Sequence, residues 1–192
     1  MTILVIGLAI FLGAHSVRIF AEPWRQRQIA RMGPGAWKGV FSLVSIAGFV
    51  LLVWGYGLAR AVPVELWSPP AWTRHLSSLL NLAAFVLLAA AYVPRNRIRA
   101  AVGHPMVAGV KLWALAHLLS NGRLADVVLF GAFLAWAVLD YRAARARDRA
   151  SGVRQAPGSF GGDLVAVVMG VVATAVFALW LHAPLIGVRP FG

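Results

Sequence analysis

Long apolar segments dominate this chain and limit the folds that are open to it. Six can be drawn, each about 16–23 residues long: Thr2–Phe20, Gly39–Ala61, Leu76–Val93, Pro105–Ser120, Leu124–Tyr141 and Leu164–Ile186. A helix needs about 20 apolar residues to cross roughly 30 Å of hydrocarbon. We therefore predict an all-α integral membrane protein, a bundle of six transmembrane helices that forms one domain over residues 1–192. The fourth segment is the shortest, and a tilted or partly re-entrant helix is an alternative for it.

The composition agrees with a membrane protein. The chain is 60% hydrophobic and 12% charged, with a mean hydropathy of +0.77, whereas a soluble domain is about half apolar and a quarter charged. Arg18 follows the first apolar core, and no basic region precedes it, so we expect a retained helix and not a cleaved signal peptide. The lipid bilayer is the expected surrounding.

Basic residues alternate between the loops and predict the topology. Three loops are strongly basic, and their residues are Arg25, Arg27, Arg31 and Lys38, then Arg95, Arg97 and Arg99, and finally Arg142, Arg145, Arg147, Arg149 and Arg154. The positive-inside rule places these three loops in the cytoplasm and both termini outside, in the periplasm of a bacterial cytoplasmic (inner) membrane. This topology also explains the net charge of +12, so we expect no nucleic acid partner.

Histidines inside apolar segments are the candidate functional residues. His15 interrupts the first segment, His104 stands at the start of the fourth, and His117 lies about 18 Å along it. Ionisable side chains in hydrocarbon are costly and generally functional. For His15 the structural alternative is a hydrogen bond to a neighbouring helix, and for His104 it is an ordinary interfacial position. His75 reads as a surface residue, and His182 is undecided.

Haem ligation or proton transfer is the chemistry that these histidines suggest. The chain has no cysteine, which excludes thiolate ligands and disulfides. His104 and His117 are 13 positions apart and so face different sides of one helix. His15 and His117 come from different helices, where two imidazoles can hold one haem iron, although their depths differ by about 9–12 Å on upright helices. Arg18, Arg95 and Arg97 are candidates to pair with haem propionates.

Several motifs resemble those of the NnrU family of bacterial membrane proteins, over almost the whole chain. They are Phe11–Ser16 (FLGAHS), Gly35–Gly39 (GAWKG), Ser45–Gly48, Leu52–Gly57, His104–Met106, Lys111–Gly122 (KLWALAHLLSNG), Leu129–Gly131, Leu181–His182 and Ile186–Val188. The family looks related to the plastid zeta-carotene isomerase, a haem b enzyme of membranes. The resemblance implies haem b with His15 and His117 as axial ligands to the iron, and a link to denitrification. His104-Pro105-Met106 is also similar to part of a motif of membrane methyltransferases, but Gly103 replaces its arginine.

Two functional classes are favoured, and a transporter of a small solute is kept as a third hypothesis. One is a haem-dependent isomerase or redox enzyme that acts on a lipophilic small molecule or on nitric oxide. The other is a non-enzymatic accessory or sensing protein, which would bind a membrane reductase of nitrite or nitric oxide or act as a homodimer. A transporter is disfavoured, because the segments contain no carboxylate pair and no internal repeat. Catalytic residues cannot be named from the sequence.

Overall fold

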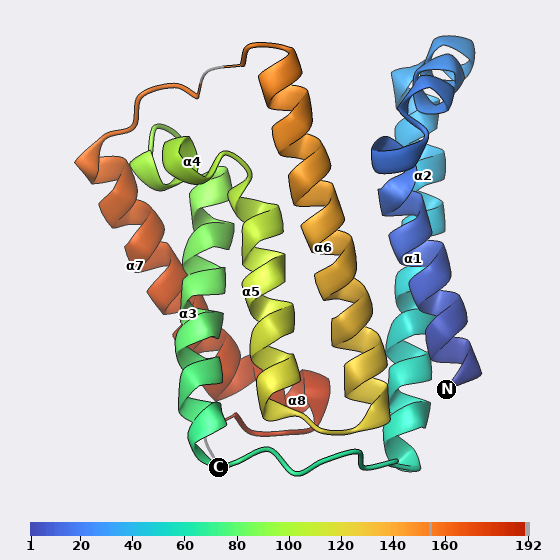
Figure 1. Cartoon of the computed structure of the whole chain (residues 1–192), viewed down its shortest axis with the longest axis vertical. Helices are drawn as coiled ribbons and strands as arrows, with labels where there is room; N and C mark the ends of the chain where they lie inside the picture. Colours follow the sequence, from blue (N-terminus) through green and yellow to red (C-terminus); the bar gives the residue numbers. More distant parts are fainter. Residues whose placement is uncertain (154, 191–192) are drawn as a thin grey trace. The chain divides into compact units, whose positions relative to one another are not determined.

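The computed structural model describes residues 1–153 and 155–190 of the protein, and the named elements in those ranges are all helices (Figure 1). They are α1 (Thr2–Phe20), α2 (Glu22–Ala61), α3 (Trp72–Tyr92), α4 (Arg97–Val102), α5 (Pro105–Ser120), α6 (Leu124–Ala150), α7 (Phe160–Val176), a π-helical turn (Phe177–Leu181) and α8 (His182–Ile186). The predicted all-α class is confirmed.

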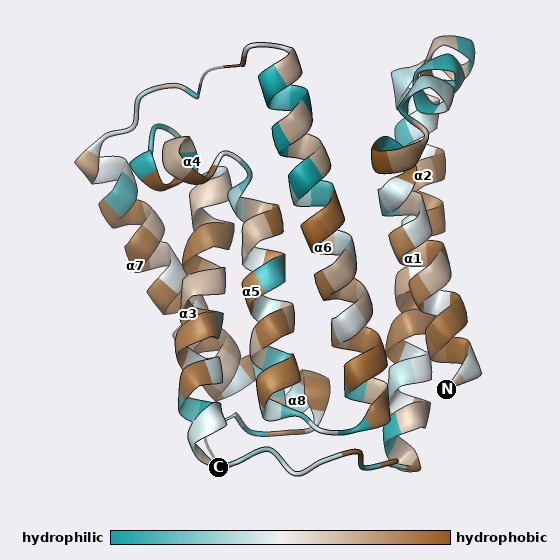
Figure 2. Ribbon diagram, viewed as in Figure 1, coloured by the Kyte–Doolittle hydropathy of each residue, from teal (hydrophilic) through white to brown (hydrophobic). Residues whose placement is uncertain are grey.

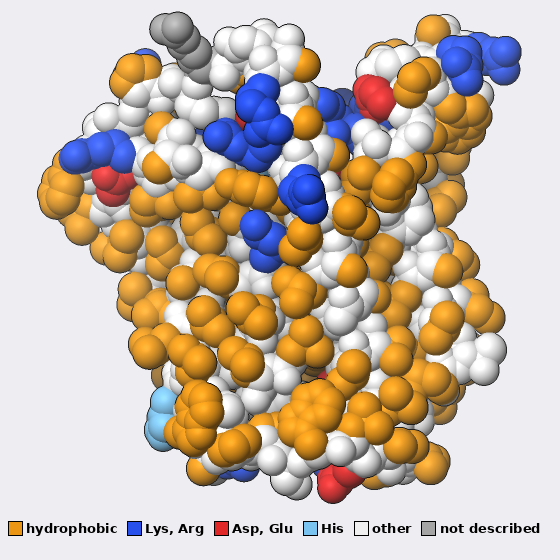
Figure 3. Space-filling view, viewed as in Figure 1, with side chains coloured by type: hydrophobic (Ala, Val, Ile, Leu, Met, Phe, Trp, Pro, Cys, Tyr) orange, Lys and Arg blue, Asp and Glu red, His pale blue; other side chains and the backbone are white. Residues whose placement is uncertain are grey.

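Five helical stretches of the described residues are long and apolar enough to cross a membrane. They are α1, α2, α3, α6 and the run Phe160–Ile186. The predicted fourth span, α5, has 16 residues, or about 24 Å of helix. Apolar residues lie along the lengths of the helices, while the last turns of α6 are hydrophilic (Figure 2). On the face shown in Figure 3, Lys and Arg lie mostly toward the helix ends. The chain is therefore a multi-pass membrane protein whose exposed apolar side chains contact lipid.

Two helices begin and end where the apolar pattern predicts, and others extend beyond it. The bounds of α1 and α5 agree with the predicted segments. Helix α2 begins at Glu22, well before the predicted Gly39, and changes direction at Gly33, whose φ of +83° is non-helical. Glu22 lies in its first turn and accepts a hydrogen bond from Arg25 at 2.9 Å. Hydropathy marks only the part of a helix that lies in lipid, so it does not reveal this polar start.

The basic loop after the fifth predicted span is also partly helical. Helix α6 continues from the predicted end at Tyr141 to Ala150, because alanine and arginine are strong helix formers outside lipid as well. The short α4 lies within the loop that follows α3. Asn96 is its N-cap and accepts a hydrogen bond from the Arg99 amide at 2.6 Å.

The chain forms two compact units, each assembled from separate stretches. Unit 1 contains Met1–Pro69 and His117–Ala143, and unit 2 contains Pro70–Ala116 and Ala144–Gly192. In unit 1, α1 and α2 pack backbone to backbone at three glycines. A side chain at Gly7 would collide with the Leu52 backbone, at Gly48 with Phe11, and at Gly55 with Leu4. Small residues permit this close approach between helices in lipid.

Unit 2 is joined by a polar network at one end. Ser159 is the N-cap of α7, and its amide donates to the carbonyl of Arg95 at 2.7 Å. Asp163, in the first turn of α7, accepts from the Arg97 amide and forms an ion pair with the Arg97 guanidinium at 3.0 Å. Asn96 is 2% exposed and donates to the carbonyls of Ala90 and Val93. These bonds hold α4 against the start of α7.

Candidate functional site

His15 lies in a shell of aromatic rings in unit 1. Its imidazole centroid is 4.3 Å from that of Phe11, 5.1 Å from Phe41 and 6.1 Å from Trp136. These rings come from α1, α2 and α6, so the histidine lies where three helices meet. The contact with Trp136 is edge-on, at 89°.

The proton of the His15 ring can be placed from its hydrogen bond. Nδ1 lies 2.7 Å from the carbonyl oxygen of Phe11, one turn earlier on α1. A carbonyl oxygen only accepts, so in the neutral ring Nδ1 carries the hydrogen and Nε2 keeps its lone pair. This is the arrangement in which a histidine offers Nε2 to a metal while its other nitrogen is held by the backbone.

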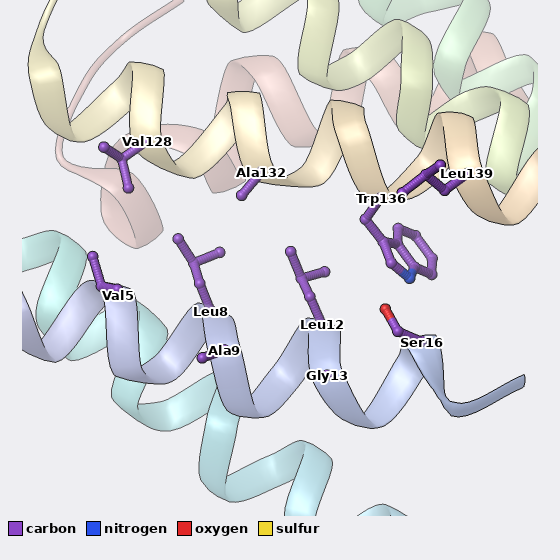
Figure 4. Close-up of a pocket in the computed structure, with 10 residues that line it drawn as sticks. All are labelled: Val5, Leu8, Ala9, Leu12, Gly13, Ser16, Val128, Ala132, Trp136 and Leu139. Atoms are coloured by element: carbon purple, nitrogen blue, oxygen red, sulfur yellow. The ribbon is translucent and has the colours of Figure 1, made fainter. Parts of the chain in front are cut away.

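A groove of about 410 Å³ runs between α1 and α6, and Trp136, whose ring contacts His15, is one of its lining residues. Val5, Leu8 and Leu12 line its α1 side, and Val128 and Ala132 line its α6 side. Figure 4 shows that these side chains point toward one another from two helices that run in the same direction. Ser16 and Trp136 lie together toward one end of the groove.

His117 lies in a different setting in the same unit. It is in the last turn of α5, and its ring stacks on Phe130 of α6 with centroids 4.5 Å apart at 27°. Phe130 in turn meets Tyr56 of α2 edge-on at 6.5 Å. The carbonyl of His117 accepts hydrogen bonds from the amide and the side chain of Asn121.

The structure does not bring the rings of His15 and His117 together. Their contacts on α6, Trp136 and Phe130, are six residues apart, which is about 9 Å along the helix and about 120° around it. Two imidazoles on one metal ion need their nitrogens only about 4 Å apart, because each bond is about 2 Å. The donor geometry at His15 fits one axial ligand of a haem, while in this arrangement His117 faces another side of α6.

His104 is paired with a carboxylate in unit 2. Its Nε2 lies 2.9 Å from Asp148 Oδ2, and Arg145 Nη1 is 3.8 Å from the same oxygen. Arg145 also covers Gly103, the residue with φ +79° that ends α4. The described partner of His104 is therefore Asp148, and its role as a cofactor-binding residue stays a prediction.

Of the three arginines predicted to pair with haem propionates, Arg18 belongs to unit 1, whereas Arg95 and Arg97 belong to unit 2, where Arg97 is paired with Asp163. Arg18 is an exposed residue in the last turn of α1, three positions after His15. Arg95 belongs to unit 2, where its backbone takes a φ of +52° and its carbonyl binds Ser159. Arg18 thus lies on the same helix as His15, whereas the described contacts of Arg95 are those of a turn residue.

The other two histidines have plain surroundings. His75 is exposed near the start of α3. His182 begins α8, and its Nδ1 lies 2.6 Å from the carbonyl of Val188. Within residues 1–153 and 155–190, no three side chains of His, Asp or Glu come together as a metal site would require.

Comparison with known proteins then decides the family. The sequence matches the family model described as NnrU protein over residues 3–190, nearly the whole chain. The chain belongs to the NnrU family. No curated protein and no solved structure matches it. The resemblance predicted from the sequence motifs is confirmed, and two of the motifs that carry it, FLGAHS and KLWALAHLLSNG, contain His15 and His117.

Two features of this NnrU chain were not predicted from its sequence. The indole nitrogen of Trp136 is buried without a hydrogen-bond partner. Tyr56 donates a 2.5 Å hydrogen bond to Asp126, which is 4% exposed. Each leaves a weak sequence signal, an indole N–H in mid-helix and a carboxylate in the first turn of an apolar helix. The hydrogen bond between Tyr56 and Asp126 joins residues 70 positions apart, and no local sequence pattern reveals it.

Proposed function

We propose that this NnrU protein binds haem b with His15 as an axial ligand and uses it on a lipophilic small molecule or on nitric oxide. The single observation that carries the proposal is the His15 ring, whose Nδ1 is held by the Phe11 carbonyl and whose Nε2 keeps its lone pair among aromatic rings. Bound there, a haem would supply an iron that can bind a small ligand or transfer an electron.

The residues of the chain have separate tasks in this proposal. His15 holds the metal, and the carbonyl of Phe11 fixes its orientation. Phe11, Phe41 and Trp136 exclude water around the ring. Arg18, one turn further toward the basic end of α1, is the cation for a propionate. His117 is not required as a ligand, in contrast to what the family resemblance implies.

The test is an absorbance spectrum of protein purified from haem-replete cells, with histidine variants. We expect a Soret band in the wild type, loss of the band in His15→Gly, and its return when imidazole is added to His15→Gly. His75→Ala, an exposed histidine, is the matched control and keeps the band, as does His117→Ala. A wild type without haem contradicts the proposal, and loss of the band in His117→Ala would show ligation by two histidines.

We also propose six spans in a bacterial cytoplasmic membrane, with α5 as the fourth and both termini in the periplasm. The charges support this topology, because the basic loops all follow odd-numbered spans. The natural absence of cysteine permits single reporters. In intact spheroplasts, Ser68→Cys should react with an impermeant maleimide, while Ala100→Cys and Ser151→Cys should not. If α5 does not cross the membrane, positions 100 and 151 will differ in reactivity.

A second candidate function is a non-enzymatic partner of a membrane reductase of nitrite or nitric oxide. Three carboxylates favour this accessory role, because each already has a partner within the protein. Asp126 accepts from Tyr56, Asp148 contacts His104, and Asp163 accepts from the Arg97 amide. Co-purification with a reductase, together with unchanged growth on nitrite in His15→Gly cells, would support this role over the haem enzyme.

A further inference from the structure

The lining of the groove between α1 and α6 extends along both helices. On each helix its lining extends over twelve residues, from Val5 to Ser16 and from Val128 to Leu139, which is about 16 Å. Alanines keep it open on both sides, at Ala9 of α1 and Ala132 of α6. Its volume of about 410 Å³ lies within the range of sites for small ligands.

One end of the groove carries a hydrogen-bond donor that lacks an acceptor. The Trp136 indole N–H is buried and has no partner. In Figure 4 its nitrogen points into the space between the helices, toward the hydroxyl of Ser16. A buried donor without an acceptor is costly, and such groups in native proteins call for an explanation. An acceptor atom on a bound molecule would satisfy the indole.

The lining also limits the charge of that molecule. It contains no ionisable side chain, because apart from Ser16 and the Trp136 indole every lining side chain is apolar or is glycine. An ionised carboxylate or phosphate among these residues would stay unpaired in a medium of low dielectric constant. A neutral carbonyl oxygen accepts a hydrogen bond from the indole N–H without that cost.

We propose that the α1–α6 groove binds a neutral, single-chain lipid that ends in a carbonyl oxygen, such as a quinone with an alkyl tail. The chain lies along Leu8, Leu12 and Ala132, and the carbonyl accepts the Trp136 N–H with Ser16 beside it. The binding site does not depend on haem. The assignment of this lipid as the substrate does rest on the proposed function, because the Trp136 ring also contacts His15.

The experiment measures binding of two probes to the purified full chain in phosphatidylcholine nanodiscs, with empty nanodiscs as the reference. Decylubiquinone carries carbonyl oxygens, and decylbenzene has the same chain without them. We expect the wild type to bind decylubiquinone more tightly. Trp136→Phe keeps a ring but removes the N–H, so decylubiquinone should bind about fivefold more weakly while decylbenzene is unchanged. Trp54→Phe, an exposed tryptophan of α2, is the control.

Two further variants test the place of binding by filling the groove from opposite walls. Ala9→Phe and Ala132→Phe should each abolish binding of both probes. Ala135→Phe, on an exposed position of α6, should bind as the wild type does. Unchanged binding in a folded groove-filling variant overturns the site. If neither variant folds, the comparison of Trp136→Phe with Trp54→Phe decides. Equal affinity for the two probes also overturns the proposal, because the groove would then hold only bilayer acyl chains.

Failure of this site and failure of the haem proposal are distinguishable. His15→Gly should lose the Soret band and still bind decylubiquinone, whereas Ala132→Phe should keep the band and no longer bind the quinone. A protein without haem that binds decylubiquinone in the groove refutes only the proposed function. Competition between haem and decylubiquinone in the wild type would refute the groove as a separate lipid site.

Discussion

Helix α1 has two faces that differ in how closely they are packed. Toward α2, Leu4 is fully buried against Gly55, and Gly7 lies against the Leu52 backbone. Toward α6, Leu8 and Leu12 line an open groove. The first face has no room even for a methyl group, whereas the second keeps about 410 Å³ beside it. The same helix is therefore a structural element on one side and a wall of a binding site on the other.

The polar groups of unit 1 differ in the same way. Tyr56 and Asp126 satisfy each other between α2 and α6, while the Trp136 N–H at the groove is left without an acceptor. A satisfied buried pair stabilises the fold, and an unsatisfied donor beside a cavity is a recognition group for something else. In unit 1, the close helix contacts and the satisfied Tyr56–Asp126 hydrogen bond thus hold the fold together. The unpaired Trp136 donor lies instead beside the space in which we propose that a ligand binds.

The largest effect is expected at the tight face. Gly55→Leu would place its side chain into the backbone of Leu4, and we expect a loss of more than about 3 kcal/mol in the free energy of unfolding. Gly57→Leu is the matched control, because nothing lies within 4 Å of a side chain at that position of α2. Thermal unfolding in detergent checks the pair. Equal stability of the two variants would contradict the close α1–α2 contact.

Leucine truncation compares the two faces directly. Leu4→Ala removes a side chain that is 0% exposed, and we expect it to cost about 2–3 kcal/mol through lost packing. Leu12→Ala, on the groove, should cost only about 1 kcal/mol, because part of its surface already lacks protein neighbours. The measurement is the midpoint of unfolding for both variants. The comparison fails if Leu12→Ala is the more destabilising.

Loss of the Tyr56 hydroxyl should have a similar or smaller effect. Tyr56→Phe leaves the buried carboxylate of Asp126 without this donor, at a cost of about 2 kcal/mol. Tyr92→Phe changes a tyrosine that is 71% exposed and should have no effect. Thermal unfolding reports the cost, and the Soret band of Tyr56→Phe should stay intact. A change in the haem spectrum without a change in stability would place Tyr56 in the functional site instead.

The smallest effect, and one of opposite sign, is expected at Trp136. Without an added lipid, Trp136→Phe removes an unpaired buried N–H, so the protein should become more stable by up to about 1 kcal/mol. Trp54→Phe gives the reference value for an exposed indole. A decrease in stability larger than that of Trp54→Phe would contradict the cost that we assign to the unpaired N–H.

Much of the fold was predictable, and the misses have physical causes. The bounds of α1 and α5 follow from hydropathy, and Pro105 begins α5 as its missing N–H permits. The early start of α2 at Glu22 and the late end of α6 at Ala150 were missed. In both cases the helix continues into polar sequence, where hydropathy carries no information and hydrogen bonds and helix propensity decide.

The candidate site was predictable only in its residue types. Their position within apolar sequence identified His15 and His117 as candidate ligands. That both bind one iron remains a prediction. The partner of His104 was missed, because Asp148 is 44 positions away in a segment read as loop. The groove was missed too, since its walls are ordinary apolar residues whose spacing is the same as that of a packed helix face.

The sequence alone determined that helices cross a membrane and which of their residues can carry chemistry. The thickness of the hydrocarbon layer sets the length of the helices, and ionisable side chains are costly within that layer. Tertiary structure decided which face of α1 is closed by glycines of α2 and which opens on Trp136, and it separated the surroundings of His15 from those of His117. These features depend on which helices pack together and on which of their residues lie side by side. Contacts between residues far apart in the chain determine both.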